Sequence, residues 1–210
     1  MQSKLLDEEA KKDGDLMEQK INKQSIRRKF LERRDSLSLS DRKQKSLRIW
    51  ENLKKEECFK QAEIVLVYMD YRSEVMTTGL VEELLQSQGG KKVYAPKVDG
   101  LDIDFYEITS LDELYPGYQQ IREPEALLDK QFTLAVSEGK KCLVLVPGAV
   151  FDRELGRMGY GKGFYDRFIH NFPAITKVGL AFDCQITGQV PRESHDKHLD
   201  MIVTESEVIK

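Results

Sequence analysis

The stretch GRMGYGKGFYD, residues 156–166, places four glycines beside an arginine and a lysine and closes on an acid. Glycines at this density let backbone amides come close to a ligand, because no Cβ stands in the way. We expect a helix to begin near Phe164, and the N-terminus of a helix carries partial positive charge. With the cations Arg157 and Lys162, these features predict a site for a phosphate or polyphosphate, and the alternative is a flexible surface turn.

The same stretch differs from a P-loop in two ways. Read from Gly156, it meets all but the last position of G-x-x-x-x-G-K-[ST], and Gly163 stands where the hydroxyl that binds magnesium should be. A P-loop also follows its strand almost at once, whereas residues 148–155 separate this stretch from the preceding apolar run. We therefore predict a phosphate site of another design.

Acids and histidines nearby could bind a metal. Asp166 falls in the first turn of the expected helix, where the helix dipole alone favours an acid. If a nucleotide occupies the loop, Asp166 could instead bind magnesium together with phosphate oxygens, and Asp196 is a similar candidate. His195 and His198 lack a third His or Cys ligand nearby, so we expect them to form hydrogen bonds or lie on the surface.

Further polar residues allow more than one interpretation. The segment KQSIRRKFLERR, residues 23–34, could be a solvated helix face or could bind nucleic acid. In a third interpretation Lys23 and Arg27, one helical turn apart, reach phosphates held by the glycines. Glu74 follows the first apolar run, where open α/β sheets bind their ligands, but it could equally be an exposed acid ahead of a helix.

The pattern of apolar residues predicts the elements that must position these side chains. Strands alternate with helices, which indicates a single α/β domain with a mostly parallel sheet flanked by helices. The expected strands are 63–69, 91–98, 102–108, 142–148, 177–182 and 201–205, of which 102–108 alternates like an edge or antiparallel strand. The expected helices are an amphipathic one from Ile21, one N-capped by Ser40, one within 76–90 that Gly89 and Gly90 end, and one over 163–172. Residues 109–131 read as a long irregular surface connection of the kind that carries binding groups.

Composition sets wider limits. The 210 residues are 40% apolar and 33% charged with a net charge of −3, which is typical of an ordinary soluble domain and gives no overall attraction to nucleic acid. No apolar run is long enough for a membrane helix and the N-terminus lacks the core of a signal peptide, so we expect a cytoplasmic protein. Cys58, Cys142 and Cys184 are expected to be reduced and mostly buried thiols. We expect residues 1–18 to be a polar extension, either a frayed helix or disordered, ahead of a catalytic domain over 19–210.

The motifs together resemble one enzyme family. PGAVFDRELGRMGYGKGFYDRF, supported by KQSIR, YRSEVMT and VPRESHDKHLDMIVTE, resembles the signature of the 5-formyltetrahydrofolate cyclo-ligases, also called 5,10-methenyltetrahydrofolate synthetases. The matching segments run from about residue 20 to residue 208. The resemblance implies an α/β fold similar to sugar-phosphate isomerases and CoA transferases rather than to P-loop NTPases.

The resemblance also implies an activity. Such an enzyme uses ATP and Mg²⁺ to convert 5-formyltetrahydrofolate, with or without a polyglutamate tail, into 5,10-methenyltetrahydrofolate, with release of ADP and phosphate. The formyl oxygen would be phosphorylated, and N10 of the same folate would then attack the formyl carbon. We expect a monomer with no nucleic-acid or membrane partner. The alternatives are another enzyme of this architecture, such as a sugar-phosphate isomerase or CoA transferase, and a nucleic-acid-binding module that uses residues 23–34.

The resemblance assigns roles residue by residue, with Arg157 and Lys162 as the catalytic cations and Asp166 and Asp196 as the magnesium ligands. The implied ATP contacts are Lys23, Gln24, Ser25, Ile26, Arg27, Arg157, Met158, Gly159, Tyr160, Gly161, Lys162, Gly163, Phe164 and Tyr165. The implied folate contacts are Met69, Glu74, Tyr160, Gly161, Lys162, Gly163 and Phe164. The glycines would therefore lie between the two ligands.

Overall fold

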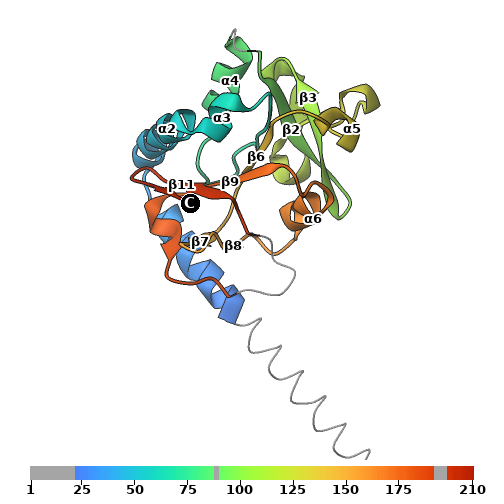
Figure 1. Ribbon diagram of the computed structural model, residues 1–210. Helices are drawn as coiled ribbons and strands as arrows, with labels where there is room; N and C mark the ends of the chain where they lie inside the picture. Colours follow the sequence, from blue (N-terminus) through green and yellow to red (C-terminus); the bar gives the residue numbers. More distant parts are fainter. Residues whose placement is uncertain (1–21, 88–89, 192–197) are drawn as a thin grey trace, which may run out of the picture.

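A mostly parallel sheet of seven strands forms the centre of the protein (Figure 1). The computed structural model describes residues 22–87, 90–191 and 198–210. Along the sheet the order is β12-β11-β9-β6-β1-β2-β3. Among the described strands of this sheet, only the pairs β2–β3 and β11–β12 are antiparallel. The strands are β1 (Ile64–Leu66), β2 (Lys92–Asp99), β3 (Asp102–Ile108), β6 (Cys142–Val146), β9 (Thr176–Leu180), β11 (Met201–Val203) and β12 (Val208–Ile209). The predicted fold class is confirmed.

Helices cover both faces of this sheet (Figure 1). On one face lie α2 (Leu39–Lys55), α3 (Glu57–Gln61) and α4 (Thr78–Gln86), and on the other lie α5 (Leu134–Ser137) and α6 (Phe164–Asn171). The residues of β1 alternate between the faces: Val65 packs in the cluster of Trp50, while Ile64 and Leu66 pack in the cluster of Phe168. Both faces are buried, which explains why the strand reads as an unbroken apolar run.

The ends of two helices differ from the expectation. Ser38 rather than Ser40 caps α2, because its hydroxyl accepts a hydrogen bond from the Asp41 backbone N–H at 3.0 Å. Helix α4 ends at Gln86, before the predicted glycines. Gly90 does adopt a left-handed conformation (φ 68°), whereas Gly89 lies outside the described residues.

Several strands also differ in length or were missed. The first strand is only β1 rather than 63–69, although 102–108 is confirmed as the antiparallel edge strand β3. The prediction of an irregular connection over 109–131 is wrong in part, because this region holds a small hairpin of β4 (Leu114–Pro116) and β5 (Arg122–Pro124). Single 3-10 turns lie around it and after β9, at η1 (Leu111–Glu113), η2 (Tyr118–Gln120), η3 (Leu128–Lys130) and η4 (Asp183–Gln185).

A second, three-stranded sheet explains why the glycine stretch does not follow a buried strand directly. Its order is β10-β7-β8, with β7 (Val150–Asp152), β8 (Arg157–Met158) and β10 (Ile186–Thr187). Strand β7 and the turn into β8 occupy the residues between β6 and the glycines. The predicted difference from a P-loop is thus confirmed in the order of the elements.

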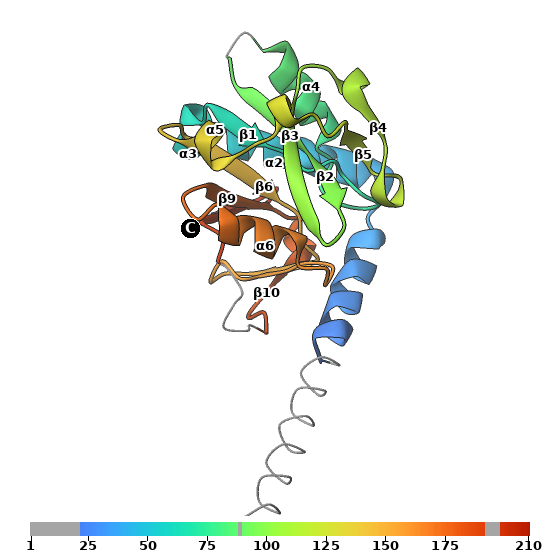
Figure 2. The same cartoon turned by 90° about the vertical axis from the view of Figure 1, so that its right-hand side faces the viewer.

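The first described helix, residues 22–35, packs on this small sheet (Figure 2). Phe30 and the partly buried Ile26 join an apolar cluster with Val150, Met158 and Val190. Because Lys23 and Arg27 stand on the same helix, this packing fixes where their side chains can reach.

Two expectations about the whole chain concern its thiols and its helices. All three cysteines are free thiols, as predicted, but only Cys142 is buried, whereas Cys58 and Cys184 are half-buried. In the part of the chain that the structure describes, every helix is too short or too polar to cross a bilayer.

Candidate functional site

A pocket of about 510 Å³ lies at the carboxyl ends of β1, β2 and β6. Open α/β sheets bind their ligands at this edge, and the volume is within the usual range for small-molecule sites. Every residue from Arg157 to Asp166 lines it, and so do four other residues that the sequence singled out, Lys23, Arg27, Met69 and Glu74. Most of the residues that the sequence singled out therefore line one cavity.

The glycine loop, residues 156–163, forms one wall of the pocket. Gly161 (φ 90°) and Gly163 (φ 70°) have left-handed backbone conformations that other residues rarely adopt. Gly163 is the N-cap residue of α6, so the helix begins at Phe164 as predicted. A Cβ at Gly163 would come within 2.7 Å of Arg167 Nη1. The loop thus brings backbone amides and the positive end of a helix to the pocket.

The 22–35 helix contacts the loop directly. Arg27 Nε donates a hydrogen bond to the Gly159 carbonyl at 2.7 Å, and burial lowers the pKa of the Arg27 guanidinium. Lys23 lines the same pocket. Of the three interpretations of the basic segment, the geometry therefore favours the one in which Lys23 and Arg27 reach the glycine loop.

The other implied contacts on this helix are placed differently. Gln24 and Ser25 are exposed, and Ile26 packs against the small sheet. None of these three lines the pocket. Their contact with ATP stays a prediction.

Arg157 and Asp166, which both line the pocket, form an ion pair. Arg157 Nη2 lies 2.5 Å from Asp166 Oδ1, and Nη1 donates to the Pro147 carbonyl at 3.1 Å. The Arg157 side chain is only 5% exposed, whereas that of Asp166 is 34% exposed. Since Gly163 is the N-cap, Asp166 does not cap α6 by a side-chain hydrogen bond. Arg157 engages one carboxylate oxygen, so the other could face a metal ion.

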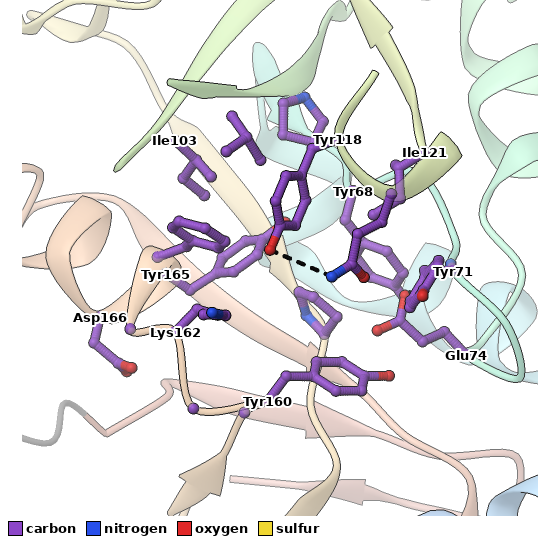
Figure 3. A pocket seen from close by; sticks show the side chains of 18 of the residues that line it. Tyr68, Tyr71, Glu74, Ile103, Tyr118, Ile121, Tyr160, Lys162, Tyr165 and Asp166 are labelled. Atoms are coloured by element: carbon purple, nitrogen blue, oxygen red, sulfur yellow. Dashed lines mark hydrogen bonds between the residues drawn. The ribbon is translucent and has the colours of Figure 1, made fainter. Parts of the chain in front are cut away.

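Glu74 forms the opposite side of the pocket, near Tyr71, while Lys162 and Asp166 lie across from it (Figure 3). Glu74 is 5% exposed, which rules out the alternative of an exposed acid. One carboxylate oxygen accepts a hydrogen bond from the Tyr71 backbone N–H at 2.9 Å. Burial raises the pKa of Glu74 to about 7, even though Arg34, the Tyr71 N–H and the Tyr160 hydroxyl all favour the ionised form.

Sequence reasoning missed a third group of lining residues. The β4–β5 hairpin supplies Tyr118, Gln119, Ile121 and Glu123, and the Tyr118 ring meets Phe164 edge to face at 6.0 Å. The signal was present only as the expectation that 109–131 carries binding groups. The remaining lining residues that were not singled out are Tyr68, Tyr71, Arg72, Pro96, Val98, Ile103, Pro147 and Pro191.

The expected metal ligands are only partly described. Asp196 and His195 lie outside the described residues. His198 is exposed and its Nδ1 lies 3.0 Å from the Glu154 carbonyl, as expected for a surface hydrogen bond. Among the residues that the structure describes, no three His, Cys, Asp or Glu side chains gather into a metal cage. Magnesium commonly needs only one or two carboxylates when phosphates supply the other ligands, so Asp166 fits such a role.

Comparison with known proteins identifies the family of this chain. The model of the 5-formyltetrahydrofolate cyclo-ligase family matches residues 19–205. The 5-formyltetrahydrofolate cyclo-ligase of Escherichia coli (strain K12) is 32% identical over 70% of this chain and 80% of its own. A probable 5-formyltetrahydrofolate cyclo-ligase of Caenorhabditis elegans is 30% identical over 77% of this chain and 82% of its own. The NMR structure of Aquifex aeolicus 5,10-methenyltetrahydrofolate synthetase is 33% identical, with a TM-score of 0.77 over 89% of this chain and 91% of that one. The chain belongs to the 5-formyltetrahydrofolate cyclo-ligase family.

Proposed function

We propose that this protein converts 5-formyltetrahydrofolate into 5,10-methenyltetrahydrofolate in the pocket described above, using ATP and releasing ADP and phosphate. The observation that carries the proposal is the two-sided lining of one cavity. A cationic glycine loop suited to phosphates faces a buried carboxylate, Glu74, suited to the N–H groups of a folate. Family membership supports the substrate and argues against the isomerase, transferase and nucleic-acid alternatives.

The chemistry begins at a formamide, whose carbon is a poor electrophile because nitrogen and oxygen share electron density. Transfer of the γ-phosphoryl group of ATP to the formyl oxygen releases ADP and leaves a cationic imino phosphate. N10 of the folate then attacks the formyl carbon and closes a five-membered ring. Phosphate departs with the formyl oxygen, N10 loses its proton, and the methenyl cation remains.

The side chains of this protein would contribute position and charge. Lys162, Lys23 and Arg27 would neutralise phosphoryl oxygens, and the loop amides would hold them as charge develops. Glu74 would hold the folate by accepting hydrogen bonds from its N–H groups. Because ring closure is intramolecular, keeping N10 near the formyl carbon is an orientation effect worth several kcal/mol in favourable systems.

Magnesium is the expected metal, and the oxygen of Asp166 that Arg157 leaves open would hold it, together with Asp196 as the second expected ligand. When bound, the ion would neutralise phosphate charge during phosphoryl transfer. Arg157 would keep the Asp166 carboxylate in one orientation through the ion pair.

The direct test is an absorbance assay with purified protein, 5-formyltetrahydrofolate, Mg²⁺ and ATP. The conjugated methenyl product absorbs in the near ultraviolet, so we expect a rise that depends on ATP and matches the ADP released mole for mole. Omission of ATP is the control. A folded protein that gives no ATP-dependent rise would contradict the proposal.

A further inference from the structure

A fully buried arginine lies directly behind the pocket. Arg34, at the end of the 22–35 helix, is 1% exposed. Its Nε donates to Ser73 Oγ at 2.9 Å, its Nη1 to the Gly148 carbonyl at 3.3 Å, and its Nη2 to the Tyr160 hydroxyl at 2.7 Å. Arg34 does not line the cavity, and the proposed chemistry gives it no role.

These three bonds join segments that are far apart in the sequence. Ser73 precedes Glu74 in the chain, Gly148 follows β6, and Tyr160 belongs to the glycine loop. The guanidinium carbon of Arg34 also lies 5.6 Å from the centre of the Tyr160 ring. A planar guanidinium can bond several acceptors in fixed directions, which a lysine ammonium on its flexible stem cannot do.

Tyr160 carries the contact from Arg34 into the pocket. Its side chain is 38% exposed, yet its hydroxyl points toward Glu74 (Figure 3). This hydroxyl accepts a hydrogen bond from Arg34 Nη2 and lies on the side of the pocket where the Glu74 carboxyl group is (Figure 3). A hydroxyl has one proton to donate, so an acceptor bond from Arg34 leaves that proton for Glu74.

We propose that Arg34 and Tyr160 are positioning residues for Glu74: the buried guanidinium holds the Tyr160 hydroxyl, which donates to the carboxylate and keeps it in place as an acceptor. The inference rests on the proposed function, in which Glu74 accepts hydrogen bonds from the folate. A buried carboxylate is costly unless opposite charge and hydrogen bonds compensate it, and Arg34 with Tyr160 supplies both.

Charged and titratable groups from several elements act on the pKa of Glu74. Arg34, from the 22–35 helix, and the Tyr160 hydroxyl, from the glycine loop, favour the ionised form of Glu74, whereas Asp70 disfavours it. Burial raises the pKa of Tyr68 and of Tyr165, and the charge of Glu74 raises both further, so both remain neutral phenols. Burial remains the largest influence on the pKa of Glu74, so loss of either helper should favour protonation.

The experiment is a carboxyl ¹³C NMR titration of the full-length protein labelled at glutamate, in which Glu74→Gln identifies the Glu74 signal. In the wild type we expect a midpoint near 7. Tyr160→Phe and Arg34→Met should each raise the midpoint by about one pH unit, because each removes a partner of the charged form. Arg34→Lys keeps the charge but not the planar set of guanidinium N–H donors, so it should raise the midpoint less than Arg34→Met does.

Matched controls separate this effect from general damage. Tyr115→Phe and Arg33→Met change exposed residues outside the pocket and should leave the midpoint unchanged. If Arg34→Met does not fold, Tyr160→Phe decides alone, since its ring is partly exposed and its packing is kept. A wild-type midpoint in folded Tyr160→Phe would overturn the proposal.

A kinetic measurement separates this inference from the proposed function. If the wild type makes no methenyl product, the proposed function fails, whatever the titration gives. If the wild type is active, Tyr160→Phe should lower kcat/KM for the folate about fivefold near pH 7, since a one-unit rise leaves about a tenth of the carboxyl ionised, and recovery is expected above about pH 9. An equal loss at all pH values would contradict the role assigned to Tyr160.

Discussion

Two cations of the glycine loop have different surroundings, although their positions in the sequence suggest one shared role. Arg157 is buried and bonded to Asp166 and the Pro147 carbonyl, so its removal would disturb the loop itself. Lys162 is exposed and faces the pocket. The effect of Lys162 on phosphate binding can therefore be measured without a large change in folding, whereas that of Arg157 cannot.

We expect Lys162→Ala to raise KM for ATP by about ten- to a hundredfold, as the loss of a charge-assisted contact of roughly 1.5–3 kcal/mol would do. The melting temperature should stay within about 2 °C of the wild type, because surface substitutions cost little stability. Steady-state kinetics and thermal unfolding give both numbers. Lys29→Ala, an exposed lysine outside the pocket, serves as the control, and an unchanged KM for ATP in Lys162→Ala would remove the role of this lysine.

Glu74 also makes a prediction about stability and pH. Its folded-state pKa of about 7 lies above the ordinary value of 4.5, so the folded protein holds this proton more tightly than the unfolded chain. Burial of the charge therefore destabilises the fold as the pH rises from the pKa of the unfolded state towards that of the folded state. The loss of stability levels off above about pH 7. Between about pH 5 and pH 8 this one group should cost about 2 to 3 kcal/mol of unfolding free energy.

Glu74→Gln has no carboxyl group to ionise, so denaturant unfolding should show a smaller loss of stability over this pH range than in the wild type. The quantity to compare is the change in unfolding free energy between the two pH values in each protein, because the other groups titrate equally in both. Glu125→Gln, at an exposed position, should follow the wild type. Parallel pH curves for wild type and Glu74→Gln would mean that Glu74 is ionised at an ordinary pKa.

At the scale of elements, the apolar pattern predicted the central sheet but not the small one. Strand β6 is buried on both faces, so its residues read as a continuous apolar run. Strands β8 and β10 have two residues each, too few to show any period. The segment SLSLSD offers several serines for one cap, and only the position of the Asp41 N–H selects Ser38.

The candidate site shows the same limit. The glycine loop and the acids after strands were visible as residue types, since their chemistry is local. The pairing of Arg157 with Asp166 depends on how the glycine loop folds back on itself, and the bonds of Arg34 to Ser73 and Tyr160 join distant segments. A single sequence reveals neither. Likewise, the β4–β5 hairpin reaches the pocket only through tertiary packing.

Asp152 ties the elements around the loop together and can be tested. It is fully buried at the end of β7, where Oδ1 accepts from the backbone N–H groups of Glu154 (3.0 Å) and Gly156 (2.7 Å). Its Oδ2 accepts from the Val190 N–H at 2.8 Å. Gly156 opens the glycine loop, so this one carboxylate anchors the loop and the segment near Val190.

In Asp152→Asn the amide nitrogen must face a backbone N–H, since both oxygens of the aspartate are acceptors. We expect a loss of about 2 kcal/mol or more in unfolding free energy, together with a raised KM for ATP. Denaturant unfolding and kinetics measure the two effects, and Asp129→Asn at an exposed position is the control. An unchanged stability in Asp152→Asn would show that the anchor contributes little.

At the scale of the whole molecule, the pocket is assembled from parts that no single unit supplies. The 22–35 helix contributes Arg27, the central sheet contributes the edge at which Glu74 lies, and the hairpin contributes Tyr118. The glycine loop contacts Arg27 at its cationic end, and its Tyr160 extends toward Glu74 at the other (Figure 3). Two ligands bound side by side would therefore share this loop while depending on different residues beyond it.

This arrangement predicts that two variants lose ligand-induced stabilisation selectively, each for a different ligand. A non-hydrolysable ATP analogue with Mg²⁺, or 5-formyltetrahydrofolate alone, should each stabilise the wild type by about 2.7 kcal/mol at about 100 times its Kd. At the same ligand concentrations Lys162→Ala should lose most of the shift from the ATP analogue and keep much of that from the folate, because its missing charge faces phosphates. Glu74→Gln should show the reverse, because its missing carboxylate faces N–H groups. Thermal unfolding of the three proteins with each ligand gives all six shifts. Variants that lose both shifts equally would mean that the two ligands do not occupy separate ends of the pocket.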